Sequence, residues 1–142
     1  MNSFVYVTYI QATPQKVWDA ITKPDVTRQF WMHTNDSDWK AGSDWRHTRL
    51  DGDTVDVQGK VLESDPPKRL IISWFAPHKA ANPELHSRVQ FDISEHKPGI
   101  ARLEVSHTDL QPDVLNGVSI GWPQVLSNMK SLLETGKAAS MW

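Results

Sequence analysis

The stretch from Gly121 to Gly136 constrains the fold of this chain more than any other segment. Its apolar residues recur at steps of three and four positions, which places them on one broad stripe of an α-helix: Trp122, Val125, Leu126, Met129, Leu132 and Leu133. Pro123 would lie in the first turn of this helix, and Gly136 follows the last apolar residue closely enough to cap it. We therefore expect a long helix that begins near Ser119 or Gly121 and buries its stripe against a large apolar surface.

The part of the chain before this helix predicts mainly short strands joined by turns. Runs rich in β-branched and aromatic residues, bounded by Gly, Pro and Asp, occur at residues 4–10, 32–39, 44–49, 54–64, 69–75, 87–95 and 100–108. Pro14 and Pro24 indicate two short helices after the first strand, the second of which runs through Phe30 and Trp31. The segment from Leu110 to Gly121 holds a proline and two glycines, so we expect a linker that crosses one end of the sheet.

Composition excludes several classes of function. A chain of 142 residues fits one domain, residues 1–142, in which residues 137–142 are expected to form a loose tail. A formal net charge of -2 without a basic cluster argues against nucleic acid as a partner, and Cys 0 excludes thiol catalysis and disulfides. No segment has the length and apolar character of a membrane span or a leader peptide. We expect a cytoplasmic protein without a membrane partner, as a monomer or a weak homodimer.

Three stretches, in the same order as the expected elements, carry a family resemblance. They are Ile10 to Ile21, Gly59 to Trp74, and Gly121 to Gly136. Together they resemble the small single-domain form of the activator of Hsp90 ATPase homologue 1-like (AHSA1) family, in the START and Bet v 1-like (SRPBCC) superfamily. The resemblance implies an α+β helix-grip fold, in which a curved antiparallel sheet of about six to seven strands wraps around a long C-terminal helix, with two short helices after the first strand.

The resemblance also implies a function, with alternatives. The superfamily typically has a pocket between the sheet and the last helix, which favours a binding protein for a small hydrophobic, aromatic or lipid-like ligand in stress or metabolism. The family name suggests an Hsp90-type chaperone as a partner, although nothing in this sequence corresponds to the extra N-terminal domain of the eukaryotic co-chaperones. Cyclases and aromatases of the superfamily make an enzyme of cyclase or hydrolase type a third hypothesis.

The residues expected to line such a pocket are mostly aromatic. One wall would consist of Trp122, Val125, Leu126 and Met129 on the last helix, with Phe30, Trp31, Trp45, Trp74 and Phe91 from the helical region and the strands. His47 and His107 lie in expected strands, where either could point inward as a polar anchor. The alternative is that all these residues simply fill the core, as an amphipathic helix on a sheet requires.

No motif of metal binding or catalysis is present in the sequence. The histidines have no helical i,i+4 spacing, and there is no HExxH sequence, glycine-rich phosphate loop or GxSxG motif. The strand arginines Arg46, Arg49, Arg88 and Arg102 are expected to pair with surface carboxylates, although one that faced inward could hold a ligand carboxylate. We therefore predict no catalytic residues, no metal and no cofactor.

Overall fold

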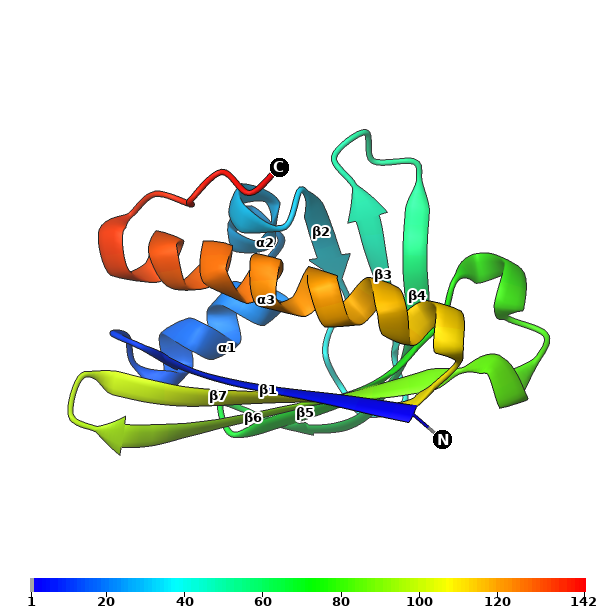
Figure 1. Ribbon diagram of the computed structural model, residues 1–142, viewed down its shortest axis with the longest axis horizontal. Coiled ribbons are helices and arrows are strands. Elements are labelled where there is room, and N and C mark those ends of the chain that lie inside the picture. Colours follow the sequence, from blue (N-terminus) through cyan, green and yellow to red (C-terminus); the bar gives the residue numbers. More distant parts are fainter. Residues whose placement is uncertain (1) are drawn as a thin grey trace.

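The protein, described by a computed structural model over residues 2–142, is a curved seven-stranded antiparallel sheet packed against one long helix. Figure 1 shows α3 (Pro112–Thr135) crossing over one face of the sheet, whose strand order is β1-β7-β6-β5-β4-β3-β2. The strands are β1 (Asn2–Ile10), β2 (His33–Asp36), β3 (Asp44–Arg49), β4 (Val55–Asp65), β5 (Arg69–Trp74), β6 (Ser87–Lys97) and β7 (Ile100–Leu110). Two short helices, α1 (Pro14–Thr22) and α2 (Pro24–Phe30), follow β1, and two 3-10 turns, η1 (Pro77–Lys79) and η2 (Pro83–Leu85), precede β6. This arrangement confirms the predicted helix-grip architecture.

The sheet buries one face because its strands alternate between core and solvent. In β7 the side chains of Ala101, Leu103, Val105 and His107 are buried, whereas the residues between them are partly exposed. The same alternation in β6 places Val89, Phe91 and Ile93 in the core. The two strands pair along most of their length, so their buried side chains form one continuous apolar surface under α3.

Gly59 permits a close approach between β4 and β5. A Cβ atom at this position would lie 2.1 Å from the backbone oxygen of Ser73, which is far inside van der Waals contact. The same Ser73 oxygen accepts a hydrogen bond of 2.8 Å from Trp45 Nε1. The missing side chain at Gly59 therefore allows the backbone of β5 to reach a position in which Trp45 is fixed in the core.

The two short helices begin as the sequence predicts. Thr13 caps α1, because its Oγ1 accepts a hydrogen bond of 3.2 Å from Lys16 N, and Pro14 occupies the first turn. Pro24 likewise occupies the first turn of α2, which has no side-chain cap at Lys23 and ends at Phe30. The chain then turns through Met32, which has a φ of 55°, into β2.

The start of α3 differs from the sequence prediction. The helix begins at Pro112 rather than near Ser119 or Gly121, so the expected linker from Leu110 to Gly121 is wrong and Pro123 lies inside the helix. Each interior glycine costs about 0.5–1 kcal/mol relative to alanine, and a proline costs more. Half-buried apolar side chains between Pro112 and Gly121 oppose this cost through contacts that the local sequence does not reveal: Val114, Leu115 and Val118.

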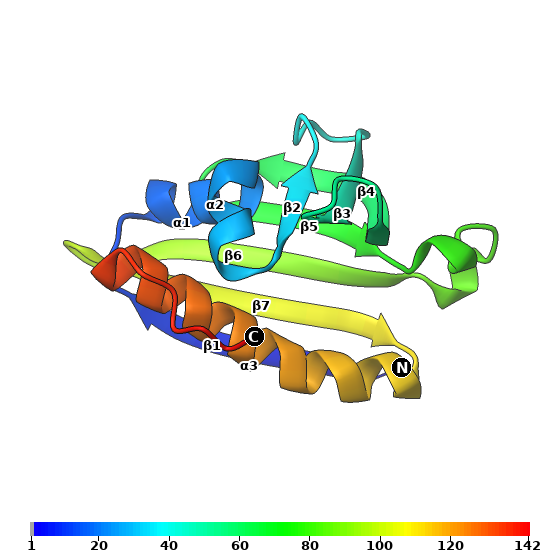
Figure 2. The same cartoon turned by 90° about the horizontal axis from the view of Figure 1, so that it is seen from above.

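The end of α3 confirms the predicted cap. Gly136 has a φ of 82°, in the left-handed region, and its N–H donates a hydrogen bond of 2.8 Å to Leu132 O. Beyond it, residues 137–142 contain no helix or strand and run back beside α3 in both ribbon views (Figures 1 and 2). Trp142 Nε1 donates a hydrogen bond of 3.0 Å to Phe30 O, so the expected loose tail contacts the end of α2.

Candidate functional site

A pocket of about 340 Å³ lies between the first half of α3, the segment that follows α2, and the tail. It is lined by Trp31, Met32, His33, Trp74, Gly117, Val118, Gly121, Trp122, Val125 and Trp142. Met32 and Trp142 are 48% and 54% exposed, so they form the rim, whereas Trp122 is 3% exposed and forms the base. The volume falls within the range of pockets that hold small organic molecules.

Trp122 holds the aromatic wall together. Its ring centroid lies 5.5 Å from that of Trp31 and 5.5 Å from that of Trp74. Behind it, Phe91 meets Trp122 edge to face at 5.9 Å. Such edge-to-face and tilted contacts are favourable for aromatic pairs, so the wall is packed before any ligand arrives.

A chain of hydrogen bonds fixes Trp122 from behind. The indole N–H can only donate, so the 3.0 Å bond from Trp122 Nε1 makes His107 Nδ1 an acceptor. The hydrogen of His107 therefore resides on Nε2, which lies 2.8 Å from Ser87 Oγ, and Ser87 Oγ in turn donates to Trp74 O at 2.8 Å. This chain links two residues of the pocket wall through one buried histidine.

Burial keeps His107 neutral. Its side chain is fully buried, and this loss of solvation lowers the pKa of His107 to about 4. At neutral pH both ring nitrogens are occupied, one as acceptor and one as donor. His107 thus orients Trp122 and has no free nitrogen for a ligand.

His47 lies behind the opposite wall. Asn35 Nδ2 donates to Ile21 O at 3.0 Å, so Asn35 Oδ1 accepts the 2.7 Å hydrogen bond from His47 Nδ1. The His47 ring stacks on His33 with centroids 4.0 Å apart and meets Trp31 edge to face at 4.8 Å. Burial, and then the charge of His33, lower the pKa of His47 to about 3. His47 is therefore a neutral support for two residues of the pocket wall.

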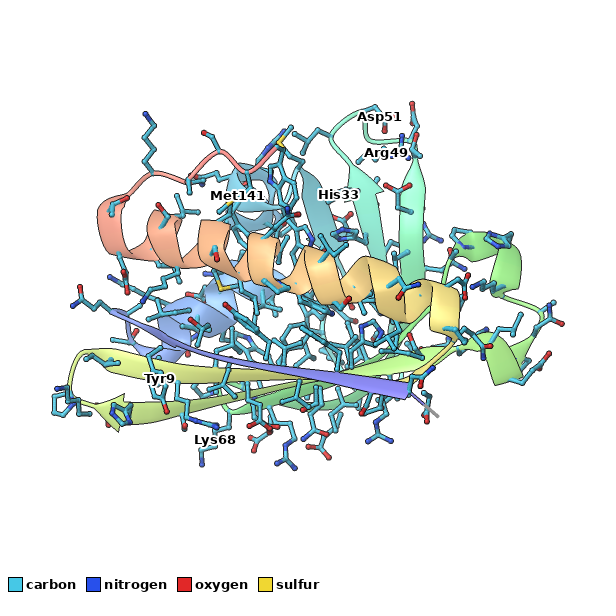
Figure 3. The ribbon with its side chains drawn as sticks, in the orientation of Figure 1. Tyr9, His33, Arg49, Asp51, Lys68 and Met141 are labelled. Atoms are coloured by element: carbon cyan, nitrogen blue, oxygen red, sulfur yellow. The ribbon has the colours of Figure 1, made fainter. Side chains whose placement is uncertain are left out.

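His33 connects the pocket to a pair of charged side chains. Its Nδ1 lies 2.8 Å from Trp31 O, and its Nε2 lies 2.8 Å from Asp56 Oδ2. Asp56 also accepts two hydrogen bonds from Arg49, at 2.8 and 2.9 Å, which together with His33 lower the pKa of Asp56 to about 2. In Figure 3, His33 lies at the start of β2, with Arg49 further out towards the Asp51 turn. Both His33 nitrogens face oxygen atoms that accept, so the ring is fully engaged.

The sequence-predicted site residues fall into three groups. Those that line the pocket are Trp31, Trp74, Trp122 and Val125. His47 and His107 lie directly behind this lining, where they contact Trp31 and Trp122. The remaining residues lie in the core and outside the pocket lining: Phe30, Trp45, Phe91, Leu126 and Met129.

Six lining residues were not predicted from the sequence: Met32, His33, Gly117, Val118, Gly121 and Trp142. Three of them lie in the segment that was expected to be a linker, and Trp142 lies in the expected tail. The sequence does contain a signal for the lining residues of α3, because Gly117, Gly121 and Val125 are spaced by four residues and share one helix face. No local signal indicates where Trp142 packs.

The charged and metal-ligating side chains are distributed over the molecule as follows. Across residues 2–142, no cluster of three or more His, Cys, Asp or Glu side chains has metal-binding geometry. The strand arginines Arg46, Arg49 and Arg88 are exposed, and Arg102 pairs with Glu104 on the outer face. The pocket can therefore enclose and orient a molecule, chiefly through aromatic surface.

A curved antiparallel sheet around a C-terminal helix, with a pocket between them, defines a helix-grip protein of the START and Bet v 1-like class. The family model described as "Activator of Hsp90 ATPase homolog 1-like protein" matches residues 11–134. The chain belongs to this family.

Solved structures agree with this assignment. Protein MLL2253 from Mesorhizobium loti is 27% identical, with a TM-score of 0.77 over 93% of this chain and 96% of that one. The Hsp90 activator PFC0360w from Plasmodium falciparum is 19% identical, with a TM-score of 0.77 over 92% and 95% of the two chains. The Aha1 dimer from Colwellia psychrerythraea is 21% identical, with a TM-score of 0.75 over 97% and 100%. At these last two identities the likeness concerns the fold alone.

The search among curated proteins found no match to the chain. No helix within residues 2–142 has the length and apolar character to cross a membrane.

Proposed function

We propose that this protein binds a small hydrophobic or aromatic molecule in the pocket between α3, the end of α2 and Trp142. The observation that carries the proposal is the lining itself, in which four tryptophans surround a volume of about 340 Å³. Because its rim residues Met32 and Trp142 are exposed, the hollow is open to solvent and its aromatic wall is wetted. A ligand that fills it removes this apolar surface from water, which is favourable.

The charges around the pocket support an uncharged ligand. Its lining includes no Lys, Arg, Asp or Glu, and its one ionisable side chain, His33, is paired with Asp56. A ligand with a net charge would lose hydration without gaining a counter-ion. The proposal therefore concerns apolar molecules with few polar groups.

The seven tryptophan indoles provide a test with internal controls. We would titrate the protein with naphthalene, a naphthoquinone, a flavone and a fatty alcohol, and follow the indole N–H signals by NMR. A molecule in the pocket is expected to shift the signals of Trp31, Trp74, Trp122 and Trp142. The signals of Trp18, Trp39 and Trp45, which lie outside the lining, should stay in place. If no compound moves the first group selectively, the proposal fails.

A second candidate function is a protein-interaction module that acts on an Hsp90-type chaperone. Support comes from the family and from an apolar strip on the outer face of the edge strand β1, where Val5, Val7 and Tyr9 are 55%, 37% and 43% exposed. Scattered apolar residues are common on surfaces, but three in register on one edge strand are suited to contact with a partner.

The test of this second candidate is a pull-down and ATPase assay with the Hsp90 homologue of the same organism. Stimulated turnover that is lost in a variant carrying Val5→Thr and Val7→Thr would support it. Unchanged turnover together with no complex would remove it. Trp31→Phe serves as the control, because Trp31 lines the pocket on the other side of the sheet.

A further inference from the structure

Two glycines of α3 are not explained by the fold. Gly117 and Gly121 lie inside the helix, and neither has the positive φ that would require glycine. A Cβ atom at either position would meet no other atom within 4 Å, in contrast to Gly59. Backbone conformation and available space would therefore both accept alanine, which is a better helix former.

What the two glycines share is the pocket. Both line it, and their spacing of four residues places them one turn apart on the same face of α3. Val118, Trp122 and Val125 continue this face, so the wall changes from side chains to bare backbone at the two glycines. A methyl group at either glycine would occupy open space at the wall of the pocket.

The four indole N–H groups of the pocket lining also differ in their hydrogen bonding. The indole N–H groups of Trp122 and Trp142 are bonded to His107 and to Phe30 O. Those of Trp31 and Trp74 have no hydrogen-bond partner within residues 2–142, and neither belongs to the fully buried unpaired atoms. Two residues of the lining thus carry an indole N–H without a protein partner in the described part of the chain, whereas both nitrogens of His33 are already engaged.

We propose that Gly117 and Gly121 are specificity-determining residues, whose bare backbone forms a flat wall for a planar aromatic ligand of about two to three rings that carries hydrogen-bond acceptors. The ligand face lies against the two glycines, and its carbonyl or ether oxygens accept from Trp31 and Trp74. This inference rests on the proposed binding function and adds to it the shape and polarity of the ligand. Molecules of equal size that are not flat are excluded, because they are too thick to fit between the two glycines and the opposite wall of the pocket.

The test compares two probes of similar carbon count, a flat naphthoquinone and the globular adamantanone, by calorimetry and by the indole NMR signals. Wild-type protein is expected to bind the naphthoquinone more tightly by at least about tenfold. Gly121→Ala and Gly117→Ala should each weaken naphthoquinone binding by about tenfold or more while raising the Tm, since alanine favours the helix. A raised Tm shows that lost binding is not caused by misfolding.

Gln124→Ala is the matched control, because Gln124 is exposed on the same helix and outside the pocket lining. It should leave the affinity for the naphthoquinone unchanged. Equal affinity for the two probes, or glycine variants that bind the naphthoquinone as wild type does, would overturn the inference while the binding function stands. If neither these probes nor any compound of the first titration shifts the pocket indoles, the inference and the proposed function both fall.

Discussion

At the scale of single residues, the hydrogen bond between Trp122 and His107 joins the pocket wall to the core. Its direction is determined, because the indole donates and His107 Nδ1 accepts over 3.0 Å. Replacing the donor leaves a ring nitrogen without a partner in either neutral tautomer of His107, since Ser87 can satisfy only the other nitrogen. A change at Trp122 or His107 is therefore expected to alter both the pocket wall and the free energy of unfolding.

We expect Trp122→Phe to destabilise the protein by about 2–4 kcal/mol, from the unpaired buried nitrogen and the lost ring volume together. Urea unfolding measures this change. Trp31→Phe is the control, because the Trp31 indole has no partner within the described residues and should cost less. In a His107→Leu background the cost of Trp122→Phe should shrink, and an unchanged cost would show that the hydrogen bond contributes nothing.

Gly59 should respond to alanine in the opposite direction to Gly117 and Gly121. The added methyl would meet the backbone oxygen of Ser73 at 2.1 Å, and a paired backbone cannot move aside as a flexible side chain can. We expect Gly59→Ala to lower the free energy of unfolding by about 2 kcal/mol or more. Thermal unfolding of Gly59→Ala beside Gly121→Ala measures the contrast, and two Tm shifts of the same sign would contradict it.

At the scale of elements, α3 consists of two unequal halves. All five of its fully buried residues lie at Trp122 or later: Trp122, Val125, Leu126, Asn128 and Met129. The first half has two interior glycines and no side-chain cap at Gln111, and Pro123 removes the donor that would bond the carbonyl one turn earlier. The part of α3 before Trp122, which contributes Gly117, Val118 and Gly121 to the pocket lining, is thus the less stable part.

Hydrogen exchange should reveal this division. We expect the amides of residues 117–121 to exchange at least about tenfold faster than those of residues 126–133, because local opening before Trp122 breaks few buried contacts. A bound naphthoquinone should slow exchange in the first half only. Pro123→Ala is expected to do the same without ligand, by restoring the missing donor. Uniform protection along α3 would show that the glycines and the proline do not weaken it.

At the scale of the whole molecule, the two buried histidines make stability depend on pH. Folding lowers the pKa from an ordinary value of 6.5 to about 3 for His47 and to about 4 for His107. Between those values the unfolded chain binds more protons than the folded one, so acid favours unfolding. The stability that depends on the neutral forms of His47 and His107 is fully present above pH 6.5, and it is lost as the pH falls towards 4.

We expect the free energy of unfolding to fall by up to about 1.4 kcal/mol per pH unit for each histidine in this window. Urea titrations from about pH 7.5 to about pH 4.5 measure the slope. His107→Leu should remove the part of the slope that comes from His107 and leave that of His47. Asp56, with its pKa lowered to about 2, takes up its proton at more acidic pH and therefore does not contribute to the slope in this range. A flat profile over this range would contradict the prediction.

Local features of the sequence determined the element types and their order. Pro14 and Pro24 opened the two short helices and Gly136 ended α3, because each acts through its own backbone conformation. The three matching stretches were sufficient for the family and the fold, which the family match over residues 11–134 confirms.

Only the tertiary structure decided where α3 begins and which residues line the pocket. Proline and glycines between Leu110 and Gly121 disfavour a helix locally, and contacts with distant elements outweigh that preference. In the same way the sequence placed eleven residues at a pocket, whereas Met129 and Phe91 lie in the core and Trp142 reaches the rim. Periodicity indicates which face of a helix is apolar, but whether an apolar side chain fills the core or borders a hollow depends on what packs against it from elsewhere in the chain.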